Sequence, residues 1–206
     1  MTRVKVCGIR RLEDALLAIE LGASAIGFVF WPGSPRFIDP HRARSIAARL
    51  PPGATSVGVF VDQPVDYVAS VAALVPLGAV QLHGSESVGD YARVRPALIK
   101  AVPVADRSDP SSALALPPHV TVLLDAHDPV RRGGTGRTID WSVAAAVAAR
   151  RPIILSGGLR ANNVTEALRR VRPYMIDVSS GVESAPGIKD AKAMRALFAA
   201  VASSNE

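Results

Sequence analysis

The chain has 206 residues, of which 49% are hydrophobic and 20% are charged. This composition is ordinary for a soluble globular enzyme and argues against a disordered chain. The single cysteine excludes an internal disulfide and a multi-cysteine zinc site, and no apolar run is long enough for a signal peptide or a membrane span. We therefore expect one domain over residues 1–206, located in the cytoplasm and without a membrane partner.

The net charge of +6 raises the question of a nucleic-acid partner. Twenty of the 24 basic residues are arginine, and they are scattered through helical stretches such as HRARSIAAR and EALRRVRP. No dense basic block or basic–aromatic interleaving occurs, and aromatic residues make up only 5% of the chain. The sequence predicts no nucleic-acid partner, because an anionic small substrate accounts equally well for a positive surface.

Short β-branched runs alternate along the chain with alanine- and leucine-rich stretches of helical period. Strands are expected at 3–7, 25–30, 55–60, 78–82, 97–102, 119–125, 152–155 and 174–178. Helices are expected at 11–21, 40–50, 64–75, 86–94, 138–149, 161–171 and 188–203, and the segment 106–117 is a weak helix at best. This order predicts one α/β domain, a compact (β/α)₈ TIM barrel whose fifth helix is short or absent.

A doubly wound sheet is the alternative fold, and it is disfavoured because no G-x-G-x-x-G follows the first strand. The strands are apolar almost throughout, as in AIGFVF and PIIL, which is typical of strands covered on both faces. In an eight-stranded barrel of this kind the active site forms at the C-terminal ends of the strands. Those ends are therefore the places to search for functional side chains.

Cys7 stands at the end of the first strand, on the same face as Lys5. A free cysteine is usually a buried inert residue, but Lys5 one layer below could favour its thiolate. Arg36 follows the second strand in GSPRF and could clamp a carboxylate, or could be a surface arginine. Gln81 and His83 in QLHG form a polar pair that could orient a substrate or serve only the structure.

Asp125 closes the apolar sixth strand in TVLLDAHD, where burial without a partner would be costly, so a functional role is expected; a helix N-cap or a loop ion pair is the alternative. Two glycine-rich stretches follow the last two strands, LSGGLR (155–160) and DVSSGVE (177–183). These loops hold phosphate in many barrels, since glycine lets backbone N–H groups approach an oxyanion. A third stretch, RRGGTGR (131–137), is long enough for a lid.

The residues together predict a phosphorylated metabolite bound between a thiol and a carboxyl, a pair suited to proton transfer. The four histidines share no metal-ligand spacing, so no metal is expected.

The chain also carries, in order from residue 5 to residue 190, the motifs KVCGIRRLEDA, GFVFWPGSPR, VGVF, VQLHGSE, LLDA, GGTGRTIDW, SGGLRANNV and DVSSGVESAPGIKD. Taken together they resemble the phosphoribosylanthranilate isomerase family of tryptophan biosynthesis. The resemblance implies an Amadori rearrangement without cofactor, in which N-(5-phosphoribosyl)anthranilate becomes 1-(2-carboxyphenylamino)-1-deoxyribulose 5-phosphate. It also implies Cys7 as general base and Asp125 as general acid.

By the same resemblance, Arg36 contacts the anthranilate carboxylate, and the loops of Gly157–Gly158 and Ser180–Gly181 take the phosphate. We expect burial to raise the pKa of Asp125, so that it can donate a proton. Arg10, where threonine is more usual, and His127 with the Asp128–Pro129 pair depart from the family pattern, and contacts of the 128–138 loop are therefore not carried over. The protein is expected to be a monomer or a homodimer.

Three other functions are less consistent with the sequence. The related isomerase family of the histidine pathway performs the same rearrangement with a pair of aspartates as acid and base. The first strand here ends in cysteine instead. A silent phosphosugar-binding subunit is opposed by the presence of both Cys7 and Asp125. A nucleic-acid module is opposed by the scattered arginines.

Overall fold

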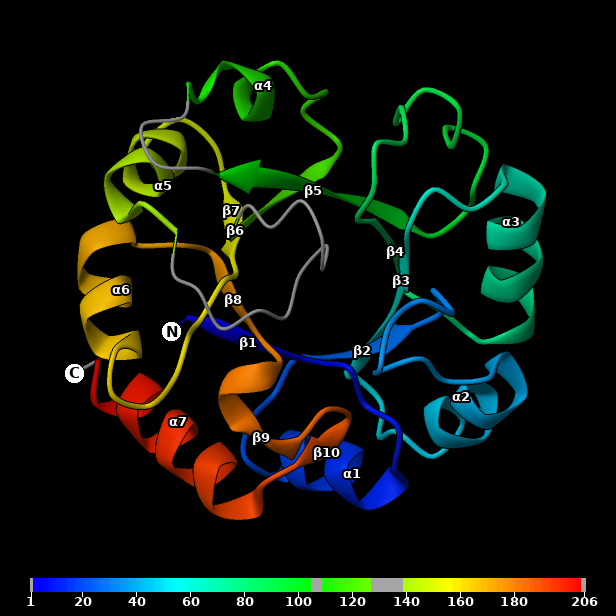
Figure 1. Cartoon of the computed structure of the whole chain (residues 1–206), viewed down its shortest axis with the longest axis horizontal. Coiled ribbons are helices and arrows are strands. Elements are labelled where there is room, and N and C mark those ends of the chain that lie inside the picture. The colour runs from blue at the N-terminus through cyan, green and yellow to red at the C-terminus, as the bar shows by residue number, and fades with distance from the viewer. Residues whose placement is uncertain (1, 105–108, 127–138, 205–206) are drawn as a thin grey trace.

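The computed structural model describes residues 2–104, 109–126 and 139–204, and eight parallel strands close into a barrel in chain order. Figure 1 shows the strands as an inner ring with helices outside it. The strands are β1 (Arg3–Cys7), β2 (Ala25–Val29), β3 (Thr55–Phe60), β4 (Ala79–Leu82), β5 (Ala97–Val104), β6 (Thr121–Ala126), β7 (Ile153–Leu155) and β8 (Met175–Val178). The predicted (β/α)₈ barrel is confirmed.

Seven α-helices lie within the described residues and surround the strands. They are α1 (Leu12–Glu20), α2 (Pro40–Ala47), α3 (Val65–Leu74), α4 (Ser111–Leu114), α5 (Trp141–Ala148), α6 (Val164–Val171) and α7 (Ala191–Ser203). The helix after β5 is α4, and its four residues confirm the expectation of a short helix at this place. No helix in these parts of the chain is both long and apolar enough to cross a membrane.

The helix expected at 86–94 is wrong, because the segment between β4 and β5 consists of successive turns. The N–H of Asp90 donates to the carbonyl of Ser87 at 3.2 Å, and that of Val94 donates to Tyr91 at 2.9 Å, which are i to i−3 bonds. Gly89 lies in the middle of the segment and Pro96 closely follows it, and both disfavour a continuous α-helix.

The helix expected at 188–203 begins three residues later, at Ala191, where the side chain of Asp190 accepts a hydrogen bond from the N–H of Ala193 at 2.8 Å. The residues before it form an antiparallel hairpin that the sequence pattern did not indicate, β9 (Glu183–Ala185) paired with β10 (Ile188–Lys189). A one-turn 3₁₀ helix, η1 (Ser180–Val182), joins β8 to this hairpin. The hairpin matters for the site because it supplies charged side chains to the end of β1.

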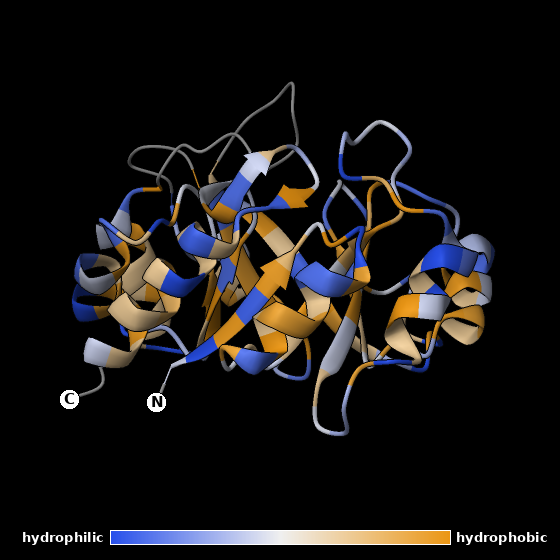
Figure 2. Cartoon of the chain, turned by 90° about the horizontal axis from the view of Figure 1, so that it is seen from below, coloured by the Kyte–Doolittle hydropathy of each residue, from blue (hydrophilic) through white to orange (hydrophobic). Residues whose placement is uncertain are grey.

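The buried hydrophobic residues form two main layers, one outside the strands and one inside the barrel, and a third small cluster. Figure 2 shows the strands as a largely hydrophobic centre between helices of mixed character. The inner layer comprises Ala25, Val57, Ala79, Ile99, Ala101, Leu123, Ile154 and Met175. Towards the C-terminal ends of the strands, the third cluster (Cys7, Val29 and Val59) and several polar side chains line the site described below.

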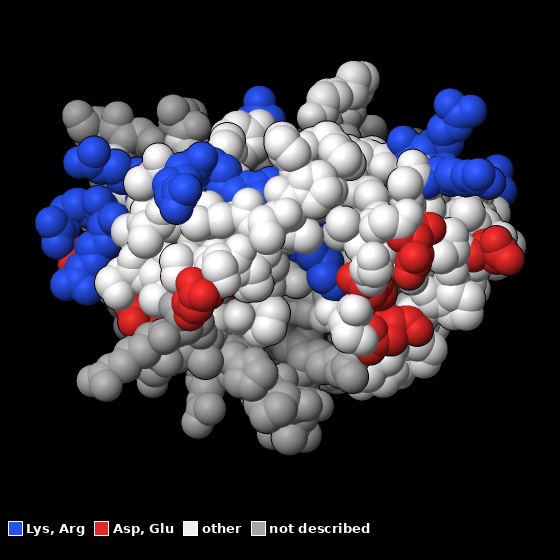
Figure 3. Space-filling model, turned by 90° about the horizontal axis from the view of Figure 1, so that it is seen from above, with Lys and Arg blue, Asp and Glu red and all other residues white. Residues whose placement is uncertain are grey.

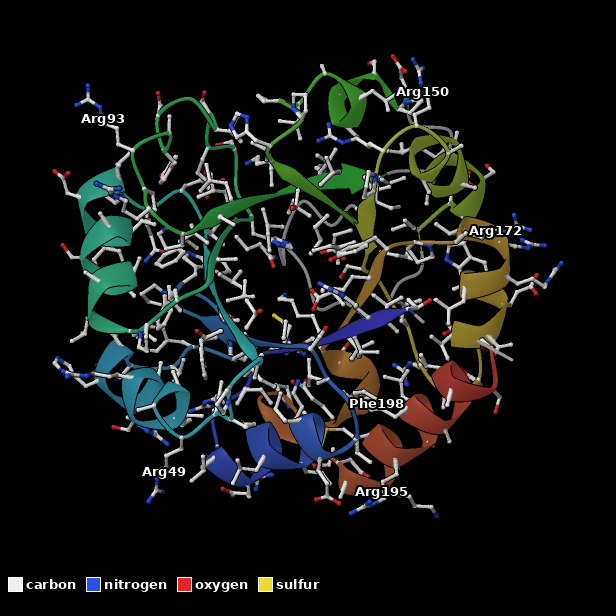
Figure 4. All side chains as sticks on the ribbon, turned by 180° about the vertical axis from the view of Figure 1, so that it is seen from behind. Arg49, Arg93, Arg150, Arg172, Arg195 and Phe198 are labelled. Carbon is white, nitrogen blue, oxygen red and sulfur yellow. The ribbon has the colours of Figure 1, made fainter. Side chains whose placement is uncertain are left out.

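The basic residues that Figure 4 labels lie on the helical rim and in the loops, and they point away from the barrel. They are Arg49, Arg93, Arg150, Arg172 and Arg195.

Candidate active site

A cavity of about 340 Å³ opens at the C-terminal ends of the strands. Five of the residues predicted for the site line it, and they are Cys7, Arg36, Gln81, His83 and Asp125. A crevice of about 30 Å³ adjoins the cavity, shares Asp125 with it, and is lined by the other four, which are Gly157, Gly158, Ser180 and Gly181. The structure therefore brings all nine predicted residues into two neighbouring hollows.

Cys7 is the last residue of β1, and Gly8, with a φ of 75°, turns the chain away directly after it. The thiol faces Gly27 on β2, where a Cβ atom would lie 2.8 Å from Sγ. Burial raises the pKa of Cys7, and the nearby Asp177 carboxylate adds to this rise, while the ammonium groups of Lys5 and Lys189 oppose it. The free protein therefore holds Cys7 as a neutral thiol near pH 7.

Asp125 is only 6% exposed on β6. The expectation that burial raises its pKa is wrong in its net direction. Burial does favour the protonated acid, but hydrogen bonds from His83, the N–H of Ala126 and Ser156 favour the carboxylate more, and the pKa of Asp125 lies below its ordinary value. His83 Nε2 lies 3.1 Å from Oδ2 of Asp125.

Gln81 and His83 project from the end of β4 into the same hollow. Gln81 is 1% exposed, and its Nε2 lies 2.8 Å from Nδ1 of His83. The other end of the Gln81 amide accepts a hydrogen bond from Lys5 Nζ at 2.9 Å. The two residues are thus parts of one hydrogen-bonded chain that begins inside the barrel and ends at Asp125.

Arg36 does not lie on the open surface, since it is held by a carboxylate of the hairpin. Its Nε and Nη2 donate to Glu183 at distances of 2.7 to 3.1 Å. Lys189, on β10, donates to the same carboxylate at 2.7 Å and to the carbonyl oxygen of Cys7. The two cations outweigh the effect of burial and lower the pKa of Glu183, so this carboxylate is ionised.

The glycines of the small crevice bring backbone close to its interior. Gly157 and Gly158 have φ values of 91° and 60°, which favour glycine over any residue with a side chain. Gly181 has a different reason for lacking a side chain, because a Cβ there would lie 1.9 Å from the carbonyl oxygen of Leu159. The crevice is therefore built by close packing of the loops after β7 and β8, which suits an oxyanion bound by backbone N–H groups.

Among the site residues that the sequence did not indicate, three lie in one segment after β8. Ser179 lines both hollows, and its buried Oγ has no hydrogen-bond partner among the described residues, as expected of a group that meets a ligand. Glu183 and Lys189 supply the charges beside Arg36 and Cys7. All three lie in the motif DVSSGVESAPGIKD, but nothing in its spacing indicates a hairpin that folds back onto β1.

The unusual Arg10 donates through Nη1 to the carbonyl of Pro35 at 3.2 Å, so it braces the loop that carries Arg36. The stretch RRGGTGR (131–137), His127 and the Asp128–Pro129 pair lie outside the described residues. No cluster of three or more histidine, cysteine, aspartate or glutamate side chains suited to a metal ion occurs in residues 2–104, 109–126 and 139–204.

Comparison with known proteins gives one consistent result. The profile of the family described as N-(5′phosphoribosyl)anthranilate (PRA) isomerase matches residues 4–200. The isomerase of Geobacter metallireducens is 49% identical over 197 residues, which cover 95% of this chain and 96% of the relative. That of Pelobacter propionicus is 47% identical over 197 residues, covering 95% of this chain and 93% of the relative.

Solved structures agree with the sequence comparison. The isomerase of Thermotoga maritima superposes with a TM-score of 0.91 at 43% identity, covering 98% of this chain and 100% of that chain. The isomerase from Thermus thermophilus gives a TM-score of 0.89 at 43% identity, covering 98% and 99%. The chain belongs to the N-(5′-phosphoribosyl)anthranilate isomerase family.

Proposed function

We propose that this enzyme converts N-(5-phosphoribosyl)anthranilate into 1-(2-carboxyphenylamino)-1-deoxyribulose 5-phosphate, a step of tryptophan biosynthesis, with Cys7 as general base and Asp125 as general acid. The observation that carries the proposal is that a thiol and a carboxyl line one cavity whose neighbouring crevice is built for an anion. A related isomerase, 42% identical with a TM-score of 0.88 over 98% of this chain and 100% of that chain, has been solved with the reduced form of this product.

The reaction needs one proton donated and one removed. Asp125 donates a proton to the furanose ring oxygen, the ring C–O bond breaks, and a Schiff base forms. Its iminium acidifies the proton on C2′, which the thiolate of Cys7 removes to give an enolamine, and this tautomerises to the ketone. No metal or cofactor is part of this scheme.

The free protein holds the two groups in the opposite protonation states, as Cys–SH and Asp–COO⁻. The reactive pair, Cys–S⁻ and Asp–COOH, contains the same number of protons. A substrate that carries a phosphate and a carboxylate brings negative charge and excludes water, and both effects favour the protonated form of Asp125. The same two effects also favour the neutral thiol, so we infer that the ammonium groups of Lys5 and Lys189 hold the Cys7 thiolate when the proton passes to Asp125.

The remaining predicted residues take binding roles in this proposal. Arg36 binds the anthranilate carboxylate, Gln81 and His83 orient the sugar and the acid, and the loops of Gly157–Gly158 and Ser180–Gly181 bind the phosphate. The placement of all these residues around adjoining hollows supports the assignment. The hydroxyl of Ser179, between the two hollows, is an additional candidate for contact with the substrate.

A small anionic metabolite is the partner that the surface favours. On the face shown in Figure 3, basic side chains form separate groups with acidic ones between them, which does not suit a nucleic-acid backbone. A structural relative from Thermotoga maritima, with a TM-score of 0.88 and 41% identity over 98% of this chain and 100% of that chain, is described as generated monomers of a dimeric isomerase. We therefore propose a monomer or a homodimer, which light scattering would distinguish.

Freshly made phosphoribosylanthranilate is fluorescent and loses its signal as it isomerises, so its decay with and without the enzyme tests the proposal. Decay no faster than in the enzyme-free control would overturn it. The aminoaldose of the histidine pathway, offered in parallel, tests whether the related isomerase activity is present. We expect turnover of the anthranilate substrate to dominate, because β1 ends in cysteine rather than aspartate.

A further inference from the structure

Five polar side chains form a continuous hydrogen-bonded chain across the barrel interior. Asp177 Oδ1 lies 3.0 Å from Lys5 Nζ, which lies 2.9 Å from Gln81 Oε1. Gln81 Nε2 lies 2.8 Å from His83 Nδ1, and His83 Nε2 lies 3.1 Å from Asp125 Oδ2. The chain therefore starts on β8 and ends at the carboxyl proposed as general acid.

Lys5 is the group that sets the direction of every bond in this chain. It is completely buried, and an ammonium group can only donate hydrogen bonds. Burial disfavours its charge, but Asp177 and Cys7 outweigh burial, and the pKa of Lys5 lies above its ordinary value. The atom of Gln81 that faces Lys5 must therefore be the carbonyl oxygen.

The orientation of Gln81 then fixes the tautomer of His83. Because Oε1 faces Lys5, the amide nitrogen faces the imidazole and donates to Nδ1, which must accept and so carries no proton. The ring proton lies on Nε2 and is donated to Asp125 Oδ2. His83 is therefore a neutral donor of fixed direction to Asp125, beside the N–H of Ala126 and the side chain of Ser156.

Lys5 also acts on the thiol. It shares the inner face of β1 with Cys7, and its charge lowers the pKa of the thiol against the larger effect of burial. One buried cation is therefore connected to both groups of the proposed acid–base pair. Of the four lysines in the chain, Lys189 also lies near Cys7, but it contacts the carbonyl rather than the Gln81 amide.

We propose that Lys5 is a positioning residue that fixes the neutral Nε2–H tautomer of His83 through Gln81, so that Asp125 meets a neutral donor, and that supports the thiolate of Cys7 at the same time. This inference rests on the proposed function for its catalytic meaning, but the tautomer can be measured without substrate. The Gln81 amide passes no proton at neutral pH, so the chain orients its members and does not relay protons between acid and base.

The most direct test is ¹⁵N NMR of the imidazole nitrogens in the ligand-free protein. The chain has four histidines, so the His83→Asn variant is used to assign the signals of His83. We expect His83 Nδ1 to be unprotonated and Nε2 to be protonated. Gln81→Glu keeps the size of the side chain but removes the donor, so His83 Nδ1 should become protonated. A protonated Nδ1 in the unaltered protein, or an unprotonated Nδ1 in Gln81→Glu, would overturn the assignment.

Lys5→Met tests the origin of the effect. With the ammonium removed, the Gln81 amide can turn over, so we expect the single tautomer of His83 to be lost and the alkylation of Cys7 by iodoacetamide to require a higher pH. We expect kcat to fall roughly 10- to 100-fold with a smaller change in KM, as when an orienting partner is removed. An unchanged tautomer together with an unmoved Cys7 titration would refute the role of Lys5.

Two further variants keep the test informative. Lys5→Met leaves Asp177 buried without its cation, so Lys5→Met/Asp177→Asn is measured beside it in case the single variant does not fold. Lys192→Met removes an exposed lysine on α7 and should alter neither the tautomer nor the turnover. If the unaltered protein shows the expected tautomer but no isomerisation, the proposed function fails while the positioning by Lys5 stands.

Discussion

Arg36 Nη2 lies 2.7 Å from Oε2 of Glu183, and the two side chains are only 11% and 4% exposed. Arg36 is thus already paired with a carboxylate before any substrate arrives. Glu183 holds the Nε and Nη2 edge of the guanidinium, which leaves Nη1 as the group free of this ion pair to meet a second carboxylate. The ion pair fixes the plane of the guanidinium, and Lys189 balances part of the added negative charge.

Arg36→Ala should raise KM for phosphoribosylanthranilate by about 10- to 100-fold, which corresponds to about 1.4 to 2.7 kcal/mol. The value of kcat should change less, because the lost contact is to a part of the substrate remote from the reacting atoms. Steady-state fluorescence decay at several substrate concentrations measures both constants. Arg93→Ala, which removes an arginine that points away from the barrel, serves as the control. An unchanged KM in Arg36→Ala would remove its role in binding the carboxylate.

Cys7→Ser and Asp125→Asn should each lower kcat by ~10²–10⁴-fold, because each replacement removes a proton transfer. Each also keeps the size of the side chain, so the circular dichroism spectrum and the thermal unfolding should remain close to those of the unaltered protein. Asp109→Asn, at an exposed position before α4, is the matched control for the carboxyl. Near-normal turnover in either active-site variant would exclude that residue from the acid–base pair.

The profile of kcat/KM against pH should be flat across neutrality. Between the lowered pKa of Asp125 and the raised pKa of Cys7 the pair holds one proton in total, so the fraction with the proton on Asp125 does not change with pH. Activity should fall in acid, where both groups are protonated, and in strong alkali, where neither is. Alkylation of Cys7 should likewise be slow at pH 7, and a narrow maximum near pH 7 would contradict the stated pKa directions.

Gly181→Ala should weaken phosphate binding, because the new Cβ meets the carbonyl oxygen of Leu159 and the loops after β7 and β8 must move apart. We expect KM to rise, and inhibition by inorganic phosphate to weaken, by about tenfold or more. Gly89→Ala is the control, since the nearest atom to a Cβ there is Ser87 Oγ at 3.5 Å. Equal phosphate inhibition in both variants would show that the crevice does not bind phosphate.

Leu123→Ala should destabilise the barrel by about 2–5 kcal/mol, because Leu123 is completely buried in the layer inside the strands and its truncation leaves a cavity. Leu16→Ala, at a position that is 43% exposed on α1, should cost less than about 0.5 kcal/mol. Urea unfolding curves for the two variants measure the difference. Similar losses would mean that the inner layer contributes little to stability.

The barrel could be predicted from the sequence because alternating strands and helices leave a strong periodic signal, as the eight strands show. The positions of Cys7 and Asp125 followed from the rule that strand ends carry the site. The turns at 87–94 were not predicted. Apolar residues at helical spacing indicated a helix there, although Gly89 disfavours one.

Contacts between distant segments could not be predicted. The pairing of Glu183 with Arg36 depends on a hairpin that folds back onto the end of β1, and no local signal encodes that approach. The direction in which the pKa of Asp125 is shifted was not predicted for the same reason. The apolar strand indicates burial, but the hydrogen-bond donor His83 lies 42 residues earlier in the chain. Local patterns specify elements, whereas electrostatic balance depends on which elements meet.

The glycine opposite Cys7 also bears on how the site could be altered by design. Because Gly27 has no side chain, the sulfur of Cys7 fits against its backbone, and a Cβ at position 27 would lie 2.8 Å from that sulfur. Cys7→Asp would give this position the aspartate that the histidine-pathway isomerases are expected to use as base. This substitution is therefore best made with Gly27 retained. Gly27→Ala would narrow the same space, so that only a small side chain would fit at position 7. Residue 27 therefore limits the size of the base that the barrel can hold at the end of β1.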